Sequence, residues 1–138
     1  MIKKIVVFIL ITGFLSIHTA AQTNRQIELF DIAKGKVVMT AQPNPKVHEE
    51  VGKFLAGITG AYPKLNPVPR EGFIIRVPLE PSVKVKTQLF TGPVDEVIII
   101  FPAYENPHLM FFDDKGRALA FNFKGDTAKL LELLNFIQ

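Results

Sequence analysis

A run of five apolar residues, Val97 to Phe101, constrains the fold of this chain more than any other segment. Four of the five are β-branched, which favours an extended backbone. Successive side chains of a strand point to opposite faces, so a strand that is apolar at every position needs cover on both faces. We therefore expect Val97–Phe101 to be a central strand of a sheet.

Six further segments have the composition or the alternation of strands. They are Ile27–Ile32, Val37–Thr40, Gly72–Leu79, Val83–Leu89, Leu109–Phe112 and Leu119–Phe123. The first two should form a β-hairpin across Ala33–Lys36. The last two should form a second hairpin, because Asp113–Arg117 between them supplies the Asp and Gly of a tight turn.

Two helices are expected as well. Asn44 suits the N-cap of the first, and Pro45 suits its first position, where the missing N–H costs nothing. The apolar stripe of this helix consists of Val47, Val51, Phe54, Leu55 and Ile58. Gly60 should end it, and Asp126 should cap the second helix. Without βαβ repeats, this order predicts an α+β fold, a mostly antiparallel β-sheet with two α-helices packed on it.

The segment between the first helix and the next strand, Ala61–Gly72, holds three prolines and no periodic apolar pattern. We expect a stiff, extended connector over the surface, too short to separate two domains. Tyr62 and Phe90 lie near prolines and outside the clearest core patterns. They are therefore candidates for exposed aromatic side chains that contact a partner. The alternative is that both merely cap the core.

The first 21 residues have the organisation of a cleaved secretory signal peptide. Lys3-Lys4 is a positive start, Ile5–Ile17 is an apolar run, and Thr19–Ala21 is a small-residue pattern for cleavage before residue 22. The apolar run is shorter than the roughly 20 residues that span a membrane, so we expect no membrane span after cleavage. Residues 22–138 should then form a single globular domain that is secreted or periplasmic.

The charge balance argues against nucleic-acid binding. Lys and Arg number 16 and Asp and Glu 13, for a net charge of +3, and two of the lysines would leave with the signal peptide. The remaining chain has no cluster of several Lys and Arg residues, whereas nucleic-acid sites need a basic surface. We therefore exclude nucleic acid as a partner.

The sequence offers few groups for covalent or metal chemistry. The chain has no cysteine, and Ser82, the one serine after the expected cleavage, lies in an expected turn without an activating motif. His48 lies on the first helix without the second histidine, four residues on, that would place two metal ligands on one face. We predict no metal site and no cofactor.

The loop that follows the central strand is one candidate site. Tyr104, Glu105 and Asn106 lie between Pro102 and His108, and loops held at strand ends often carry binding groups. Tyr104 and His108 are the candidate binding residues. Glu105 and His108 are also a candidate acid/base pair if they lie within hydrogen-bond reach. The alternative is a turn with exposed polar residues, since Asn and Pro favour turns by themselves.

Three cationic residues, Arg76, Lys84 and Lys86, are the second candidate site. If Gly72–Leu79 and Val83–Leu89 pair with each other, these charges gather on one exposed face. Such a face would suit a carboxylate, a phosphate or an acidic wall polymer. The alternative is a solvated face without a ligand, which would show no salt-dependent binding.

Four segments together resemble a group of small exported bacterial proteins of unassigned function. They are Pro78–Val85, Val94–Pro102, Phe112–Asp114 and Lys124–Thr127. The resemblance covers most of Gln26–Phe136 and implies an exported bacterial domain. It implies no catalytic motif, so no functional residue is transferred from it.

Three hypotheses for the function follow. The first is a non-enzymatic exported domain that binds an envelope protein, an acidic ligand or a wall polymer through the cationic residues or through the loop 104–108. The second is a small acid/base hydrolase or lyase that uses Glu105 and His108. The third is a structural domain that self-associates as a homodimer, because two helices would leave part of an apolar sheet uncovered.

Overall fold

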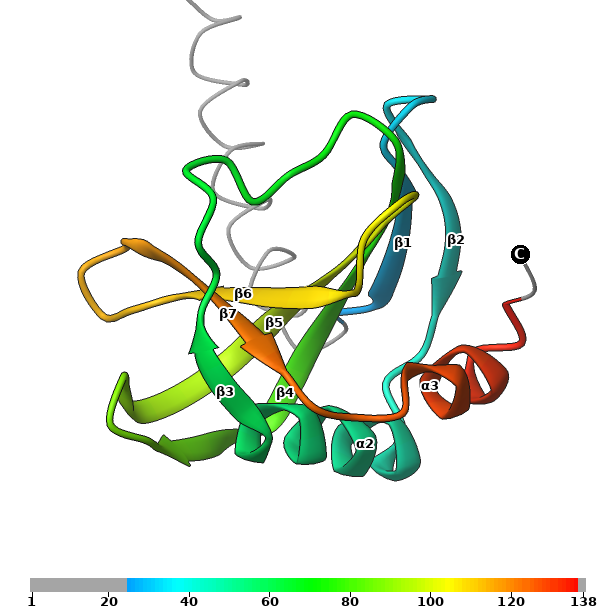
Figure 1. The fold of residues 1–138 in the computed structure, drawn as a ribbon. Coiled ribbons are helices and arrows are strands. Elements are labelled where there is room, and N and C mark those ends of the chain that lie inside the picture. The colour runs from blue at the N-terminus through cyan, green and yellow to red at the C-terminus, as the bar shows by residue number, and fades with distance from the viewer. Residues whose placement is uncertain (1–24, 137–138) are drawn as a thin grey trace, which may run out of the picture.

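The computed structural model describes residues 25–136. They form one sheet of seven strands and two helices that pack on it (Figure 1). The strands are β1 (Ile27–Asp31), β2 (Lys36–Ala41), β3 (Ile58–Ala61), β4 (Gly72–Lys86), β5 (Thr91–Pro102), β6 (His108–Phe112) and β7 (Ala118–Phe123). The helices are α2 (Pro45–Ala56) and α3 (Thr127–Leu133). The expected signal peptide, residues 1–21, lies outside the described residues. None of the helices within 25–136 is long and apolar enough to cross a membrane.

All neighbouring strands are antiparallel, in the order β2-β1-β4-β5-β6-β7-β3. The α+β fold expected from the sequence is therefore confirmed, as are the two hairpins, β1–β2 and β6–β7. The apolar run lies in β5, the fourth of the seven strands, and Val97, Ile99 and Ile100 are fully buried. This confirms the prediction that Val97–Phe101 is a central strand.

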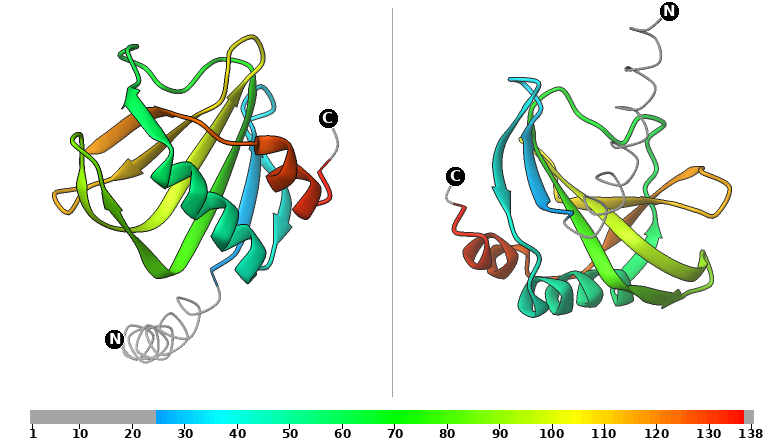
Figure 2. Two further views of the ribbon diagram at one scale, coloured as in Figure 1. Left: turned by 60° about the horizontal axis from the view of Figure 1, so that its bottom comes forward. Right: turned by 180° about the vertical axis from the view of Figure 1, so that it is seen from behind.

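Both helices lie on one face of the sheet, and the connector of residues 62–71 crosses the other face (Figure 1 and Figure 2). Helix α2 starts as expected, because the Asn44 side chain accepts a hydrogen bond from the Val47 N–H at 2.9 Å. Asp126 caps α3 in the same way, through the Ala128 N–H at 3.1 Å. Helix α2 buries Val47, Val51, Phe54 and Leu55 against the sheet.

Helix α2 ends earlier than the sequence predicts. The Gly57 N–H donates to the Lys53 carbonyl at 2.9 Å, and the Gly57 carbonyl accepts from the Lys124 N–H at 2.8 Å. A Cβ at position 57 would lie 2.4 Å from the Lys124 carbonyl oxygen, so only glycine fits this approach. The chain then enters β3, an unexpected edge strand that pairs with β7. The expected helix end at Gly60 is therefore wrong, and α2 connects β2 and β3, the two edge strands of the sheet.

The two strands expected at Gly72–Leu79 and Val83–Leu89 are in fact parts of one strand, β4. Its register against β5 shifts between Pro78 and Val83, and the peptide bond between Glu80 and Pro81, inside this stretch, is cis. Both halves of β4 pair with β5 and neither pairs with the other. The condition on which the cationic patch depended, that these two segments pair with each other, is therefore not met.

Candidate functional site

The loop between β5 and β6 holds the residues that the sequence singled out, but it divides them between surface and interior. Tyr104 is 89% exposed, and Glu105 and Asn106 are exposed as well. His108 is the first residue of β6 and is only 1% exposed. The expectation that His108 is presented together with the exposed loop residues is therefore wrong, because the connector covers its ring.

The His108 ring is held by two contacts from the connector. Its Nε2 lies 2.6 Å from the Pro67 carbonyl oxygen, and its plane stacks on the Tyr62 ring with centroids 3.8 Å apart and an interplanar angle of 13°. A carbonyl oxygen only accepts, so Nε2 carries the donated proton. In the neutral ring, Nδ1 then has a lone pair, and within residues 25–136 this buried atom has no hydrogen-bond partner. The contact thus defines the neutral tautomer of His108.

An ion pair joins the same two segments at the surface. The Lys64 ammonium donates to the Glu105 carboxylate. This hydrogen bond lowers the pKa of Glu105 and raises the pKa of Lys64. Burial lowers the pKa of His108. We call Tyr62, Lys64, Pro67, Glu105 and His108 the connector clasp, since their contacts fasten the connector to the start of β6.

The backbone fixes the connector at both of its ends. The Tyr62 N–H donates to the Ala120 carbonyl at 2.9 Å, beside β3. The Ala103 N–H donates to the Glu71 carbonyl at 3.2 Å, beside β4. The prolines of the connector favour extended backbone between these ends. The connector and the β5–β6 loop are therefore tied to each other as well as to the sheet.

Apolar side chains project from these tied segments into solvent. Leu65 is fully exposed, and Val68 of the connector is also exposed, as is Tyr104 on the opposing loop. A shallow cleft of about 250 Å³ runs between the two segments, lined by Pro69, Arg70, Glu71, Pro102, Ala103, Tyr104 and Glu105. Arg70 and Tyr104 line this cleft together, and Leu65 and Val68 are exposed on the connector beside it in the sequence. We call these four residues the loop surface. Loops that are held in place by a rigid scaffold often carry binding residues.

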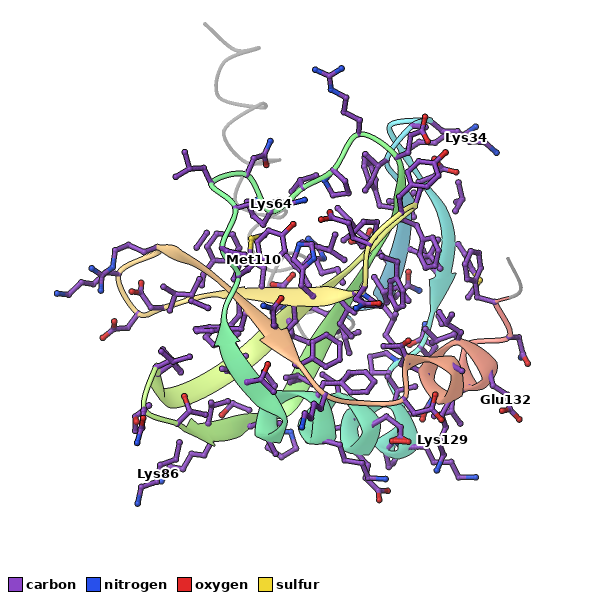
Figure 3. The ribbon with its side chains drawn as sticks, viewed as in Figure 1. Lys34, Lys64, Lys86, Met110, Lys129 and Glu132 are labelled. Carbon is purple, nitrogen blue, oxygen red and sulfur yellow. The ribbon has the colours of Figure 1, made fainter. Side chains whose placement is uncertain are left out.

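The cationic patch expected from Arg76, Lys84 and Lys86 is not formed. Arg76 pairs with Glu28 on β1 and, at 3.1 Å, with Glu96 on β5. Lys84 and Lys86 lie beyond the register shift of β4, and Lys86 lies at the end of the molecule opposite to Lys64 (Figure 3). The patch required two paired strands, whereas all three residues lie along one strand and Arg76 is already neutralised by carboxylates.

The sheet face opposite the helices carries some apolar side chains beside the connector. Phe30, Ile74 and Ile98 are half-buried there. They alternate along their strands with the residues that pack under the helices. The hairpin β1–β2 extends the sheet and does not cover this face. The homodimer of the third hypothesis stays a prediction.

The geometry does not favour the acid/base pair of Glu105 and His108. The His108 Nε2 is occupied by the Pro67 carbonyl, and the ring lies beneath Tyr62. Glu105 is occupied by Lys64, and the cleft beside it does not include His108. Within residues 25–136 no group of three His, Asp or Glu side chains is placed to hold a metal ion.

A second histidine makes a similar contact elsewhere. The Nε2 of His48, on α2, lies 2.7 Å from the Pro81 carbonyl oxygen at the bend of β4. Here the ring is half-buried and borders an open pocket of about 290 Å³. The pocket is lined by Ile27, Pro43, Asn44, Pro45, Val47, His48, Val77, Pro78, Glu80 and Pro81.

Sequence reasoning missed three members of the connector clasp. Tyr62 and Phe90 fit the alternative interpretation better than exposure: Tyr62 packs on His108, and Phe90 packs edge-on against Phe111 with centroids 4.8 Å apart. The sequence around Lys64 and Pro67 does not indicate that they belong to a site, because their partners lie 41 residues further along the chain. Comparison of the chain with protein-family models, with curated proteins and with solved structures finds no match.

Proposed function

We propose that the protein is an exported, non-enzymatic domain that binds a protein partner through the loop surface. The observation that carries this proposal is Tyr104, which is 89% exposed while its neighbours Ala103 and Glu105 are both bonded to the connector. An aromatic side chain gains much contact area on binding and has few rotatable bonds to order. Export is the expectation from residues 1–21.

The connector clasp supports this proposal because it holds the loop surface in place before binding. Ordering a loop during association lowers affinity, and a loop that is already ordered avoids that cost. Here the Lys64–Glu105 ion pair and the His108–Pro67 hydrogen bond join the two segments that carry Leu65 and Tyr104.

The charges of the site favour a protein partner over an acidic polymer. Lys64 is paired with Glu105, and Arg70 borders the cleft together with Glu71. A polyanion needs several uncompensated cations. An apolar surface that contains Tyr and Arg is instead typical of protein-binding hot spots.

A selection from a random peptide library tests the proposal. Peptides selected on the protein should lose about tenfold or more in affinity for Tyr104→Ala and for Leu65→Ala, measured by calorimetry or by a surface-based assay. The matched control is Leu89→Ala, because Leu89 is also exposed but lies between β4 and β5. Peptides that bind the Tyr104 and Leu65 variants as tightly as the unmodified protein would contradict the proposal.

A further inference from the structure

We propose that the connector clasp is a pH-dependent device, in which protonation of His108 releases the connector and so dismantles the loop surface. This inference rests on the proposed function, since it names the regulation of that same site. It predicts a partner that is held at neutral pH and released in a mildly acidic medium.

The closed clasp favours the neutral imidazole. The Nε2–H donates to the Pro67 carbonyl, and Nδ1 is buried without a hydrogen-bond partner among residues 25–136. A buried neutral acceptor without a partner costs less than a buried charge. The neutral ring is therefore compatible with the closed arrangement.

Protonation of the ring disfavours this arrangement. A second proton on Nδ1 would place an N–H on a buried nitrogen that makes no hydrogen bond in the closed clasp, and it would add a positive charge to a ring that is only 1% exposed. Both changes are costly in an environment from which water is excluded. Displacement of the connector removes Pro67 and Tyr62 from the ring and lets water solvate both nitrogens.

The surrounding groups do not compensate for the new charge. The charged groups that act on the ring are Glu105 of the loop and Lys64 of the connector, and they have opposite signs. They already form an ion pair with each other. The connector also contributes Tyr62, and β5 presents the apolar Ile100 as the register partner of His108. Burial lowers the pKa of His108 and outweighs the Pro67 carbonyl, the Glu105 charge and the Asn106 backbone, all of which favour the protonated ring.

The direction of the pH dependence follows from these contacts. The open ring is solvated and protonates near the ordinary histidine pKa of about 6.5. The closed ring protonates only at lower pH, so between these two values the open form binds more protons. The ratio of open to closed connector should then rise up to about tenfold for each unit by which the pH falls below about 6.5.

Amide hydrogen exchange of the protein between pH 7.5 and pH 5 tests this inference, with rates corrected for the intrinsic pH dependence. The reporters are the amides of Tyr62 and Ala103, which hold the two ends of the connector. Their protection should fall by tenfold or more over this range. The amide of Ile99 in the centre of β5 should keep its protection.

Two matched variants identify the group responsible. In His108→Gln the side-chain amide still donates to the Pro67 carbonyl but does not titrate, so the pH dependence should disappear. His48→Gln changes the other histidine that donates to a proline carbonyl and should keep the response. A pH-independent connector in the unmodified protein, or an unchanged response in His108→Gln, would overturn the inference.

An NMR titration of the unmodified protein covers the case in which His108→Gln does not fold. The midpoint of the His108 ring signals should coincide with the loss of connector protection, and separate midpoints would overturn the inference. No partner is used in these measurements. A failed peptide selection would therefore contradict the proposed function and leave the result on His108 intact.

Discussion

Two histidines of this protein make nearly the same hydrogen bond in different surroundings. His108 contacts the Pro67 carbonyl at 2.6 Å, and His48 contacts the Pro81 carbonyl at 2.7 Å. The His108 ring is buried beneath an aromatic side chain, whereas the His48 ring is half-buried beside an open pocket. The two rings therefore share a hydrogen bond to a proline carbonyl and differ in burial, and burial is what disfavours a charged ring.

The two contacts also fasten different kinds of segment. His48 ties α2 to the bend of β4, which is already held on both sides by its pairing with β5. His108 ties β6 to a connector that has no regular structure between residues 62 and 71. Loss of the His48 contact therefore leaves its surroundings in place, whereas loss of the His108 contact removes a main attachment of the connector.

The largest expected difference between the two regions is in the free energy of unfolding after each histidine is replaced by alanine. His108→Ala removes a buried ring and leaves the Pro67 carbonyl without its donor. We expect the free energy of unfolding to fall by about 2–4 kcal/mol. His48→Ala should change it by no more than about 0.5–1 kcal/mol. Urea unfolding with a common m-value measures both, and equal losses would remove the distinction.

The second largest expected effect is a dependence of the free energy of unfolding on pH, caused by His108. The pKa of His108 is lowered in the folded protein, so the unfolded chain binds more protons between that value and about 6.5. The contribution of His108 is complete above about pH 6.5 and declines as the pH falls below it, by at most about 1.4 kcal/mol per pH unit. Unfolding between pH 7.5 and pH 5 measures this slope.

The same pH range separates histidine from the carboxylates. The pKa values of Glu105 and Asp113 are lowered by their hydrogen bonds, so their contributions are lost only below their ordinary range near pH 4. His108→Gln should therefore flatten the slope between pH 7.5 and pH 5. A slope that persists in this variant and disappears in His48→Gln would reverse the comparison.

Loss of the aromatic stack should have a smaller effect. Tyr62→Leu keeps an apolar side chain over His108 but removes the parallel ring contact, and we expect a loss of about 1 kcal/mol. Tyr104→Leu is the control, because this exposed ring makes little contact in the free protein. Thermal unfolding should therefore show a lower midpoint for the Tyr62 variant alone.

The smallest expected effect is a shift in the pKa of His108 after neutralisation of Glu105. It tests how much the charge of Glu105 contributes to the difference between the two histidines. Glu105→Gln removes the negative charge that favours the His108 cation, so the pKa of His108 should fall further. An upward shift for His108 in the NMR titration would show that loss of the Lys64 pair matters more than loss of the charge.

The features that could be predicted from the sequence depend on local signals. Asn44 and Asp126 cap helices where their side chains reach backbone N–H groups two or three residues ahead. Asp113 closes the β6–β7 turn through the N–H groups of Lys115 and Arg117. The run Val97–Phe101 indicated its own central position because its composition requires cover on both faces.

The features that could not be predicted depend on partners far along the chain. Ile58 continued the apolar stripe of α2, and only the bond between Gly57 and Lys124 shows why the helix stops before it. The continuation of β4 past Pro78 and Pro81 depends on its pairing with β5. At the candidate site, the sequence indicated Tyr104 and His108 but not that Pro67 and Tyr62 would cover one of them.

The link that α2 makes between β2 and β3 has a geometric consequence for the whole sheet. Six spacings of about 4.8 Å would place the edges of a flat seven-stranded sheet about 29 Å apart. A helix of 12 residues is about 18 Å long. The sheet must therefore be curved, with its two edge strands closer together than in a flat sheet. The length of α2 limits the distance between these two edges.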